Sequence, residues 1–166
     1  MARQLEGRVA LITGAGRGQG LSAAQLFAEH GAKLVITDLD AGSVDAAVDA
    51  ISARGGEAAG VVGDVSKPED VRAALAAAQS RFGGLDILYN NAGIGFSAKQ
   101  RMGIEMSDLV SCTEEDWDRI MAINLTGVFL MCKYGVPMLI ARGGGVVINT
   151  ASIGGLRGGP SAHAYA

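Results

Sequence analysis

The feature that most constrains the fold is a regular alternation of short apolar runs with longer segments whose apolar residues recur at helical spacing. The runs predict five strands, at residues 8–13, 33–38, 58–63, 85–90 and 145–151. The segments between them predict helices at residues 18–30, 43–54, 66–82 and 113–142. Strands that alternate with such helices form βαβ units around a parallel sheet. We therefore expect an α/β fold with a doubly wound, open parallel sheet.

Length and composition limit the chain to one folded domain, residues 1–166. With 49% hydrophobic and 19% charged residues, it can bury a substantial core. A net charge of -3 without a basic cluster argues against a nucleic-acid or anionic-membrane partner. Cys112 and Cys132 are too few for a disulfide framework or a metal site, so we expect reduced thiols and no metal. The sequence shows no signal-peptide pattern and no apolar run near the ~20 residues of a membrane span, and we expect a cytoplasmic protein.

A glycine cluster between the first predicted strand and the first predicted helix indicates a nucleotide site. Residues 13–20 read TGAGRGQG. Glycine permits tight turns and lets backbone amides approach a pyrophosphate at a helix N-terminus. A tight turn alone would also use glycine, but the strand, loop and helix follow the order of a Rossmann-like dinucleotide-binding domain. The cofactor-binding candidates in this loop are Gly14, Arg17, Gly18, Gln19 and Gly20.

An acidic residue at the end of the second predicted strand favours NAD over NADP. Asp38 lies 18 residues after Gly20, where this fold places an acid against the adenosine ribose. A carboxylate accepts hydrogen bonds from the ribose diol and repels a 2′-phosphate. Asp38 could instead cap the next helix, a role that Asp40 could fill equally well. Arg17 is evidence in the other direction, because an arginine in the loop could pair with a phosphate.

With these residues in view, the chain resembles the short-chain dehydrogenase/reductase family. The glycine loop fits that family's TGxxxGxG pattern, and residues 90–93 read NNAG, as the family does after its fourth strand. Asp64 and Val65 are similar to the family's adenine-contacting pair. Asn124, within INLTGVF, resembles the family's helix asparagine, and Tyr165 follows Ser152 at the family's spacing of 13 residues.

The resemblance implies a NAD-dependent oxidoreductase that moves a hydride between nicotinamide and a secondary alcohol or ketone. Tyr165 would be the general acid/base, Ser152 would position the substrate oxygen, and Asn124 would support a proton relay. The implied cofactor contacts are Asp38, Asp64, Val65, Asn91, Gly93 and Tyr165, in addition to the glycine loop. Two other functions remain open at this point: a noncatalytic NAD-binding fragment or sensor, and a methyltransferase of related fold.

The sequence departs from the family pattern after Tyr165. The family's tyrosine motif is YxxxK, and its lysine would fall four residues after Tyr165, beyond Ala166. The resemblance therefore implies that residues 1–166 lack the last part of the family domain. We expect the sheet to be incomplete at its C-terminal edge and this polypeptide by itself to be catalytically inactive.

The long helical segment carries an unusual pattern of apolar residues. Asn124 shares a helical stripe with Trp117, Ile120 and Met121, which we expect to face the core. A satisfied core asparagine and a functional amide are both compatible with that position. We also expect Phe129 and Met131 to be core residues. Because residues after Asn124 are apolar nearly all round the helix, and because family members often associate through this helix, we expect a homo-oligomer, a dimer or a tetramer.

Residues 93–112 form the only long irregular stretch in the sequence. They include apolar side chains at Met102, Ile104, Met106 and Leu109. The segment could be a variable surface loop or a lid beside the substrate cleft.

Overall fold

The computed structural model describes residues 3–95, 102–157 and 163–166. Its centre is a five-stranded sheet with the strand order β3-β2-β1-β4-β5, in which every neighbouring pair is parallel. The strands are β1 Val9–Thr13, β2 Lys33–Asp38, β3 Glu57–Val62, β4 Ile87–Asn90 and β5 Val146–Asn149. The expected doubly wound, Rossmann-like sheet is thus confirmed.

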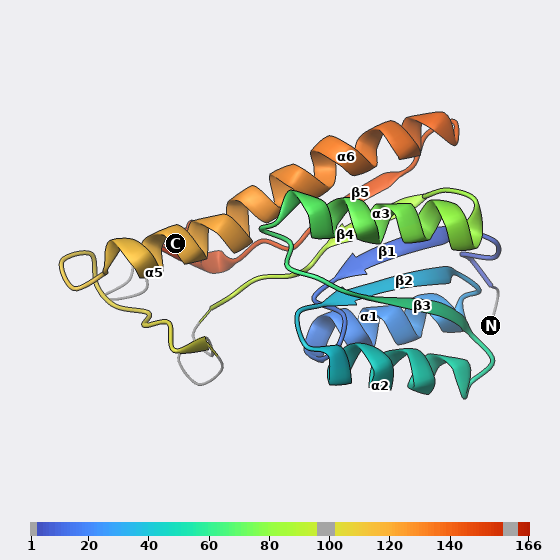
Figure 1. Ribbon diagram of the computed structural model, residues 1–166, viewed down its shortest axis with the longest axis horizontal. Coiled ribbons are helices and arrows are strands. Elements are labelled where there is room, and N and C mark those ends of the chain that lie inside the picture. Colours follow the sequence, from blue (N-terminus) through green and yellow to red (C-terminus); the bar gives the residue numbers. More distant parts are fainter. Residues whose placement is uncertain (1–2, 96–101, 158–162) are drawn as a thin grey trace.

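Helices cover both faces of this sheet (Figure 1). They are α1 Gly18–Glu29, α2 Ala41–Ser52, α3 Pro68–Phe82, α5 Glu114–Met121 and α6 Gly127–Ala141. Helices α1 and α2 lie on one face, while α3 and α6 lie on the other. Side chains of β1 alternate between the two cores: Val9 and Leu11 join the α3/α6 core, and Ala10 and Ile12 join the α1/α2 core. This two-sided burial explains why β1 and β2 read as continuous apolar runs.

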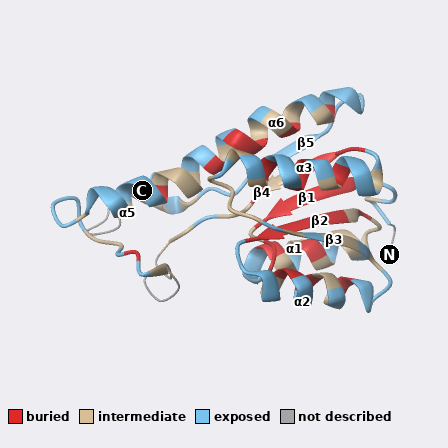
Figure 2. Ribbon diagram, viewed as in Figure 1, coloured by how far each residue is buried: buried red, intermediate tan, exposed pale blue. Residues whose placement is uncertain are grey.

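Strand β5 lies at an open edge of the sheet. It pairs with β4, and all four of its residues are exposed (Figure 2). The exposed residues include Val146, Val147 and Ile148. The expectation that the sheet is incomplete at this edge is therefore confirmed.

Two predicted helix starts have different outcomes. Thr113 caps α5 as expected, because its hydroxyl accepts a hydrogen bond from the Asp116 amide at 3.1 Å. The capping box that residues 66–69 suggest for α3 is wrong. Lys67 is the N-cap residue, and Ser66 donates from its amide and hydroxyl to Asp64 Oδ1 instead. A proline follows directly, and its fixed φ suits the first turn of a helix.

The predicted helix at residues 113–142 is interrupted by a π-helical turn, η1, at Ala122–Thr126. With α5 and α6 it forms a helical stretch, Glu114–Ala141, that is long and apolar enough to cross a membrane by length and composition alone. That differs from the expectation that no run approaches such a length. One such helix is weak evidence for a membrane span, since it rests on length and composition alone. Helix α6 packs on α3 and on strands β4 and β5, and 28% of the apolar window is buried.

The outer face of this helical stretch corrects a prediction. Trp117 is 41% exposed and Phe129 is 57% exposed, so neither is a core residue, whereas Ile120 and Met131 are buried as expected. Apolar periodicity identifies a stripe on a helix, but it does not show which stripe meets the rest of the molecule. Cys112 and Cys132 are free thiols, as expected.

Candidate active site and cofactor cleft

The candidate site lies at the carboxyl ends of the strands, where the strand order reverses direction between β1 and β4. In open α/β sheets this point forms a crevice, because the connections after the two strands run to opposite faces. Two adjoining clefts occupy it. The first has a volume of about 380 Å³ and the second about 590 Å³. Both are lined in part by Gln19, Asn91, Ala92, Gly93 and Ile94.

The glycine loop forms the floor of the first cleft. Gly14 has a φ of +62°, and a Cβ there would lie 2.8 Å from Ala92 Cα. A Cβ on Gly20 would collide with the Gly14 carbonyl oxygen and with Nδ2 of the Asn91 side chain. Gly18 has open space where a side chain would be, and Arg17, the N-cap residue of α1, makes no side-chain capping bond. The N-terminus of α1 is thus shaped to receive an anionic group on its backbone amides.

Asn91 fastens the loop to the end of β4. Its side-chain amide donates to the carbonyl oxygens of Thr13 at 3.0 Å and Gly14 at 3.2 Å. The Thr13 hydroxyl in turn accepts from the backbone amides of Asn91 and Ala92. Asn91 therefore shapes the first cleft through the loop backbone. Thr13 has the same role. It is part of the TGxxxGxG pattern but was not named as a site residue from the sequence, and its place in that pattern was the available signal.

Asp38 lines the first cleft at the end of β2 and is only 8% exposed. Its carboxylate accepts hydrogen bonds from the backbone amides of Gly16 at 3.0 Å, Leu39 at 2.8 Å and Asp40 at 3.4 Å. These amides orient the carboxylate and hold its charge in place. They also couple the acid after β2 directly to the glycine loop.

Asp40, and not Asp38, is the helix cap. Its side chain accepts from the Ser43 amide at 2.8 Å and from the Ser43 hydroxyl, and so caps α2. These two bonds, with a smaller contribution from the positive charge of Arg17, hold the pKa of Asp40 below its usual range. The alternative role considered for Asp38 is thus filled by its neighbour.

Asp64 and Val65 form another part of the first cleft. Asp64 accepts the two bonds from Ser66, and its own amide donates to Asp70 at 2.9 Å. Val65 packs closely against α6, where a Cβ on Gly127 would lie 2.8 Å from Val65 Cγ2. The pair is therefore fixed between α3 and α6, with one side toward the cleft.

Asn124 lies in the π-helical turn and is bound to the chain after β4. Its Oδ1 accepts from the Ile94 amide at 2.8 Å, and its Nδ2 donates to the Ile94 carbonyl at 2.9 Å. This settles how the amide is satisfied: both of its ends bond one backbone residue. A π-turn widens the helix by one residue and is frequent at functional sites. No periodicity argument predicts such a turn.

Ser152 and Tyr165 lie in the second cleft, together with Asn124. The Ser152 Oγ accepts from the Gly154 amide at 3.1 Å and begins a short 3-10 helix at Ile153–Gly155. The Tyr165 ring lies against two glycines, since a Cβ on either Gly95 or Gly154 would be 3.3 Å from it. The structure thus brings the three predicted catalytic residues to one cleft.

The first cleft also contains apolar residues that the sequence did not single out as site residues. They are Leu39, Ile94, Met102 and Ile123. Ile94 directly follows the NNAG segment and Ile123 directly precedes Asn124, so adjacency to recognised motifs was the available signal. Among the described residues, no group of three His, Cys, Asp or Glu side chains is placed to hold a metal ion.

Comparison with known proteins agrees with this geometry. The family model for short chain dehydrogenases matches residues 8–166. The chain is 41% identical over 158 residues to a cyclohexanol dehydrogenase of Acinetobacter sp. (strain SE19), an alignment that covers 95% of this chain and 60% of that protein. It is 40% identical over 156 residues to a 2,5-dichloro-2,5-cyclohexadiene-1,4-diol dehydrogenase of Sphingobium indicum, covering 94% and 59% of the two chains.

A solved structure supports the same relationship. A crystal structure of a protein assigned to the short-chain dehydrogenases/reductases, from Burkholderia xenovorans, matches with a TM-score of 0.87 and 36% identity. The match covers 99% of this chain and 64% of that one. The chain belongs to the short-chain dehydrogenase family, whose members are oxidoreductases that use nicotinamide cofactors. It spans about 60% of the length of the curated relatives it matches.

Proposed function

We propose that this chain is the cofactor-binding and catalytic part of a NAD-dependent oxidoreductase that interconverts a secondary alcohol and a ketone. The observation that carries the proposal is the continuity of the two clefts. The first contains the glycine loop and Asp38, and the second contains Asn124, Ser152 and Tyr165. A dinucleotide that enters along the first cleft extends toward the second over the residues that line both.

The residues present fit a dinucleotide. Gly14 and Gly20 sit where any side chain would collide with neighbouring atoms, and the open N-terminus of α1 suits a pyrophosphate. The oriented carboxylate of Asp38 suits a ribose diol. When bound, the nicotinamide supplies or takes up the hydride.

The protein side chains move the proton and hold the substrate oxygen. Tyr165 exchanges the proton of the substrate hydroxyl as general acid/base. The Ser152 oxygen already accepts from Gly154, which leaves its hydroxyl hydrogen to donate to the substrate oxygen. Both ends of the Asn124 amide are engaged by Ile94, so Asn124 supports the proton relay as a positioning residue.

The charges around the ribose position support NAD over NADP. Asp38 places an oriented carboxylate in the first cleft at the end of β2, where a 2′-phosphate would meet like charge. Arg17, which argued for NADP, lies close enough to Asp40 to lower the pKa of that carboxyl. Its charge is therefore partly balanced before any cofactor binds.

Two of the matched relatives support a proposal for the class of substrate. The cyclohexanol dehydrogenase and the cyclohexadienediol dehydrogenase are both named for ring alcohols. We therefore place the substrate among cyclic secondary alcohols and their ketones.

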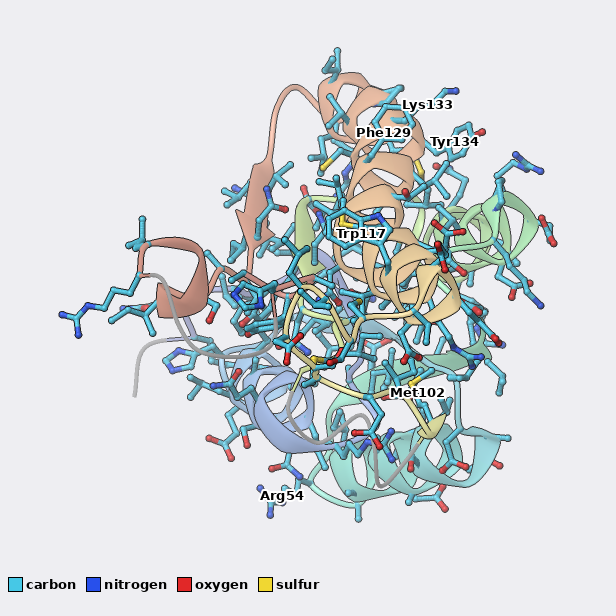
Figure 3. The ribbon with its side chains drawn as sticks, turned by 90° about the vertical axis from the view of Figure 1, so that its left-hand side faces the viewer. Arg54, Met102, Trp117, Phe129, Lys133 and Tyr134 are labelled. Atoms are coloured by element: carbon cyan, nitrogen blue, oxygen red, sulfur yellow. The ribbon has the colours of Figure 1, made fainter. Side chains whose placement is uncertain are left out.

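The exposed apolar face of the long helical stretch supports association with a second copy of this chain. Leu125, Phe129 and Ile140 are exposed on it. Lys133 lies 5.6 Å from the centre of the Phe129 ring and 5.4 Å from that of the Tyr134 ring, and all three are on α6 (Figure 3). The first turn of α5 carries Glu114–Asp116. Two antiparallel copies of the stretch would bring these acids toward Lys133 of the other copy. Phe129→Glu places a charge on the apolar face, and it should therefore shift the protein toward monomers in sedimentation velocity.

Calorimetric titration with NAD, NADP and S-adenosylmethionine tests the function, together with a hydride-transfer assay on a panel of cyclic alcohols. We expect residues 1–166 to bind NAD most tightly of the three, and we expect a polypeptide that extends through the family's lysine to oxidise cyclohexanol-like substrates. NAD binding without turnover by a polypeptide that extends through the family's lysine would favour the noncatalytic sensor. Binding of S-adenosylmethionine in preference to NAD would contradict the proposal.

A further inference from the structure

The long segment between β4 and α5 places one described side chain in the nucleotide cleft. Met102 lines the first cleft, together with Asp38, Asp64 and Val65, and is absent from the lining of the second cleft around Tyr165. Figure 3 looks onto the carboxyl edge of the sheet and shows Met102 on that open side. Asp38 and Asp64 belong to the adenosine end of the proposed cofactor site. Met102 therefore lies in the cleft that contains the proposed adenosine contacts, and not in the cleft that contains Tyr165.

A small buried cluster holds Met102 in this position. Ile104 is only 2% exposed and packs against Ile120 of α5, which is 1% exposed. Met102, Ile94 and Ala164 pack on this pair, as does Met106. The cluster thus joins the wall of the nucleotide cleft to the residue directly before Tyr165.

The chemistry of the cleft suits the faces of a purine. Leu39, Val65 and Ile123 line it beside Met102, so apolar side chains of several elements converge around the space next to Asp38. A methionine is flexible and polarizable, and its sulfur makes favourable contacts with aromatic rings. We propose that Met102 packs on the adenine base of the bound nucleotide, and that Ile104 is a positioning residue that holds Met102 there. The proposal rests on the nucleotide binding proposed above.

ADP is the sharpest probe, because it carries the adenosine half without the nicotinamide. In calorimetric titrations, Met102→Ala should weaken the binding of ADP and of NAD by the same factor, roughly fivefold. Met102→Leu should stay within about twofold of the unsubstituted protein, since it keeps the apolar volume. Leu109→Ala is the matched control: it lies in the same segment but is exposed and outside the cluster, so ADP affinity should not change.

The outcomes separate this proposal from the proposed function. If neither ADP nor NAD binds the unsubstituted protein, the proposed function falls, and this proposal falls with it. If both bind and Met102→Ala binds them equally well, only the role of Met102 is overturned. An equal loss for ADP and NAD, with Leu109→Ala unchanged, supports the assignment to the adenosine half.

A double-mutant cycle tests Ile104. If Ile104 acts through Met102, Ile104→Ala should weaken ADP binding roughly threefold, and the double variant should bind no more weakly than Met102→Ala alone. Additive losses would overturn the positioning role. Ile104→Val should restore most of the affinity, and thermal melts of each variant show whether the fold is intact.

Discussion

Two buried aspartates lie at opposite ends of the strands of the sheet, one at the carboxyl ends and one at the amino ends, and their hydrogen-bond partners differ in kind. We call these two sides of the sheet its carboxyl edge and its amino edge. Asp38, at the carboxyl edge, is 8% exposed and bonds three backbone amides. Asp86, at the amino edge, is 4% exposed and bonds the guanidinium groups of Arg8 at 3.3 Å and Arg142 at 3.0 Å, in addition to the Val9 amide. Asp86 is a charge neutralised inside the protein, whereas Asp38 is a charge oriented toward a cleft.

The difference between Asp38 and Asp86 indicates that the two ends of the strands have different roles, one in ligand binding and one in stability. Burial alone would raise the pKa of Asp86, but the Val9 amide, Arg142 and Arg8 together hold it below its usual range. The same residue ties the start of β1 to the start of β5, since the Val146 amide donates to the Asp86 carbonyl. Substitutions at the carboxyl edge should therefore change binding and turnover, and those at the amino edge should change the free energy of unfolding.

The largest expected effect is at the carboxyl edge. In a polypeptide that extends through the family's lysine, Tyr165→Phe should lower kcat/KM for a cyclic alcohol by at least about 100-fold, because it removes the proton-exchanging hydroxyl. NAD affinity and the melting temperature should change little. Tyr134→Phe is the matched control and should keep turnover, because Tyr134 lies outside the second cleft and its hydroxyl accepts from Arg72 of α3. Retention of activity by Tyr165→Phe would remove Tyr165 from the mechanism.

The next effect is at the amino edge. Asp86→Asn should lower the free energy of unfolding by about 1–2 kcal/mol in urea titrations, because it removes the buried carboxylate that bonds Arg8 and Arg142, whose own guanidinium groups stay partly hydrated. NAD affinity of the folded protein should stay within about twofold. A large change in NAD affinity with an unchanged free energy of unfolding would contradict the assignment of Asp86 to stability.

The acid dependence of that effect has a definite sign. The pKa of Asp86 in the folded protein lies below the ordinary value of 3.8, so its stabilisation is full above that pH and is lost as the pH falls through the folded pKa. Urea titrations at about pH 5 and about pH 3 should therefore show a smaller difference between Asp86→Asn and the unsubstituted protein at the lower pH.

Sequence reasoning was most successful where one local pattern determines the structure. Lys33–Asp38 is a strand with the predicted bounds, because it is a continuous apolar run buried on both faces. The glycine loop, Asp38 and Asn91 meet in one cleft because the carboxyl ends of parallel strands share an edge. These are consequences of chain order and residue type.

The remainder depends on competition between neighbours that no local pattern resolves. Asp64 takes both donors of Ser66, and so the capping box at the start of α3 does not form. Asn124 bonds the Ile94 backbone from a π-turn whose extra residue shifts the helical register. Trp117 fits the apolar stripe and is nevertheless exposed. For Ser66 and Asn124, a hydrogen bond to another part of the chain decides the outcome.

A smaller effect is expected on the ratio of NAD affinity to NADP affinity, which depends on the carboxylate of Asp38. We expect NAD to bind the unsubstituted protein at least about tenfold more tightly than NADP, or about 1.4 kcal/mol. Asp38→Ala should narrow this ratio to less than about threefold, because the variant neither bonds the diol nor repels the 2′-phosphate. Titration of both cofactors into both proteins measures the ratio. Equal affinity for the two cofactors in the unsubstituted protein would contradict the assignment.

The smallest effect distinguishes the two carboxylates that follow β2. Asp40 accepts the Ser43 amide and hydroxyl as the cap of α2, and it lies outside the lining of the first cleft. Asp40→Ala should therefore lower the melting temperature by roughly 2–4 °C through loss of the cap. It should leave the NAD/NADP ratio within about twofold, because Asp38 keeps its bonds to the Gly16 and Leu39 amides. If Asp40→Ala instead removes the preference for NAD while Asp38→Ala does not, the cofactor is selected by the helix cap, and the orientation of Asp38 toward the cleft has another purpose.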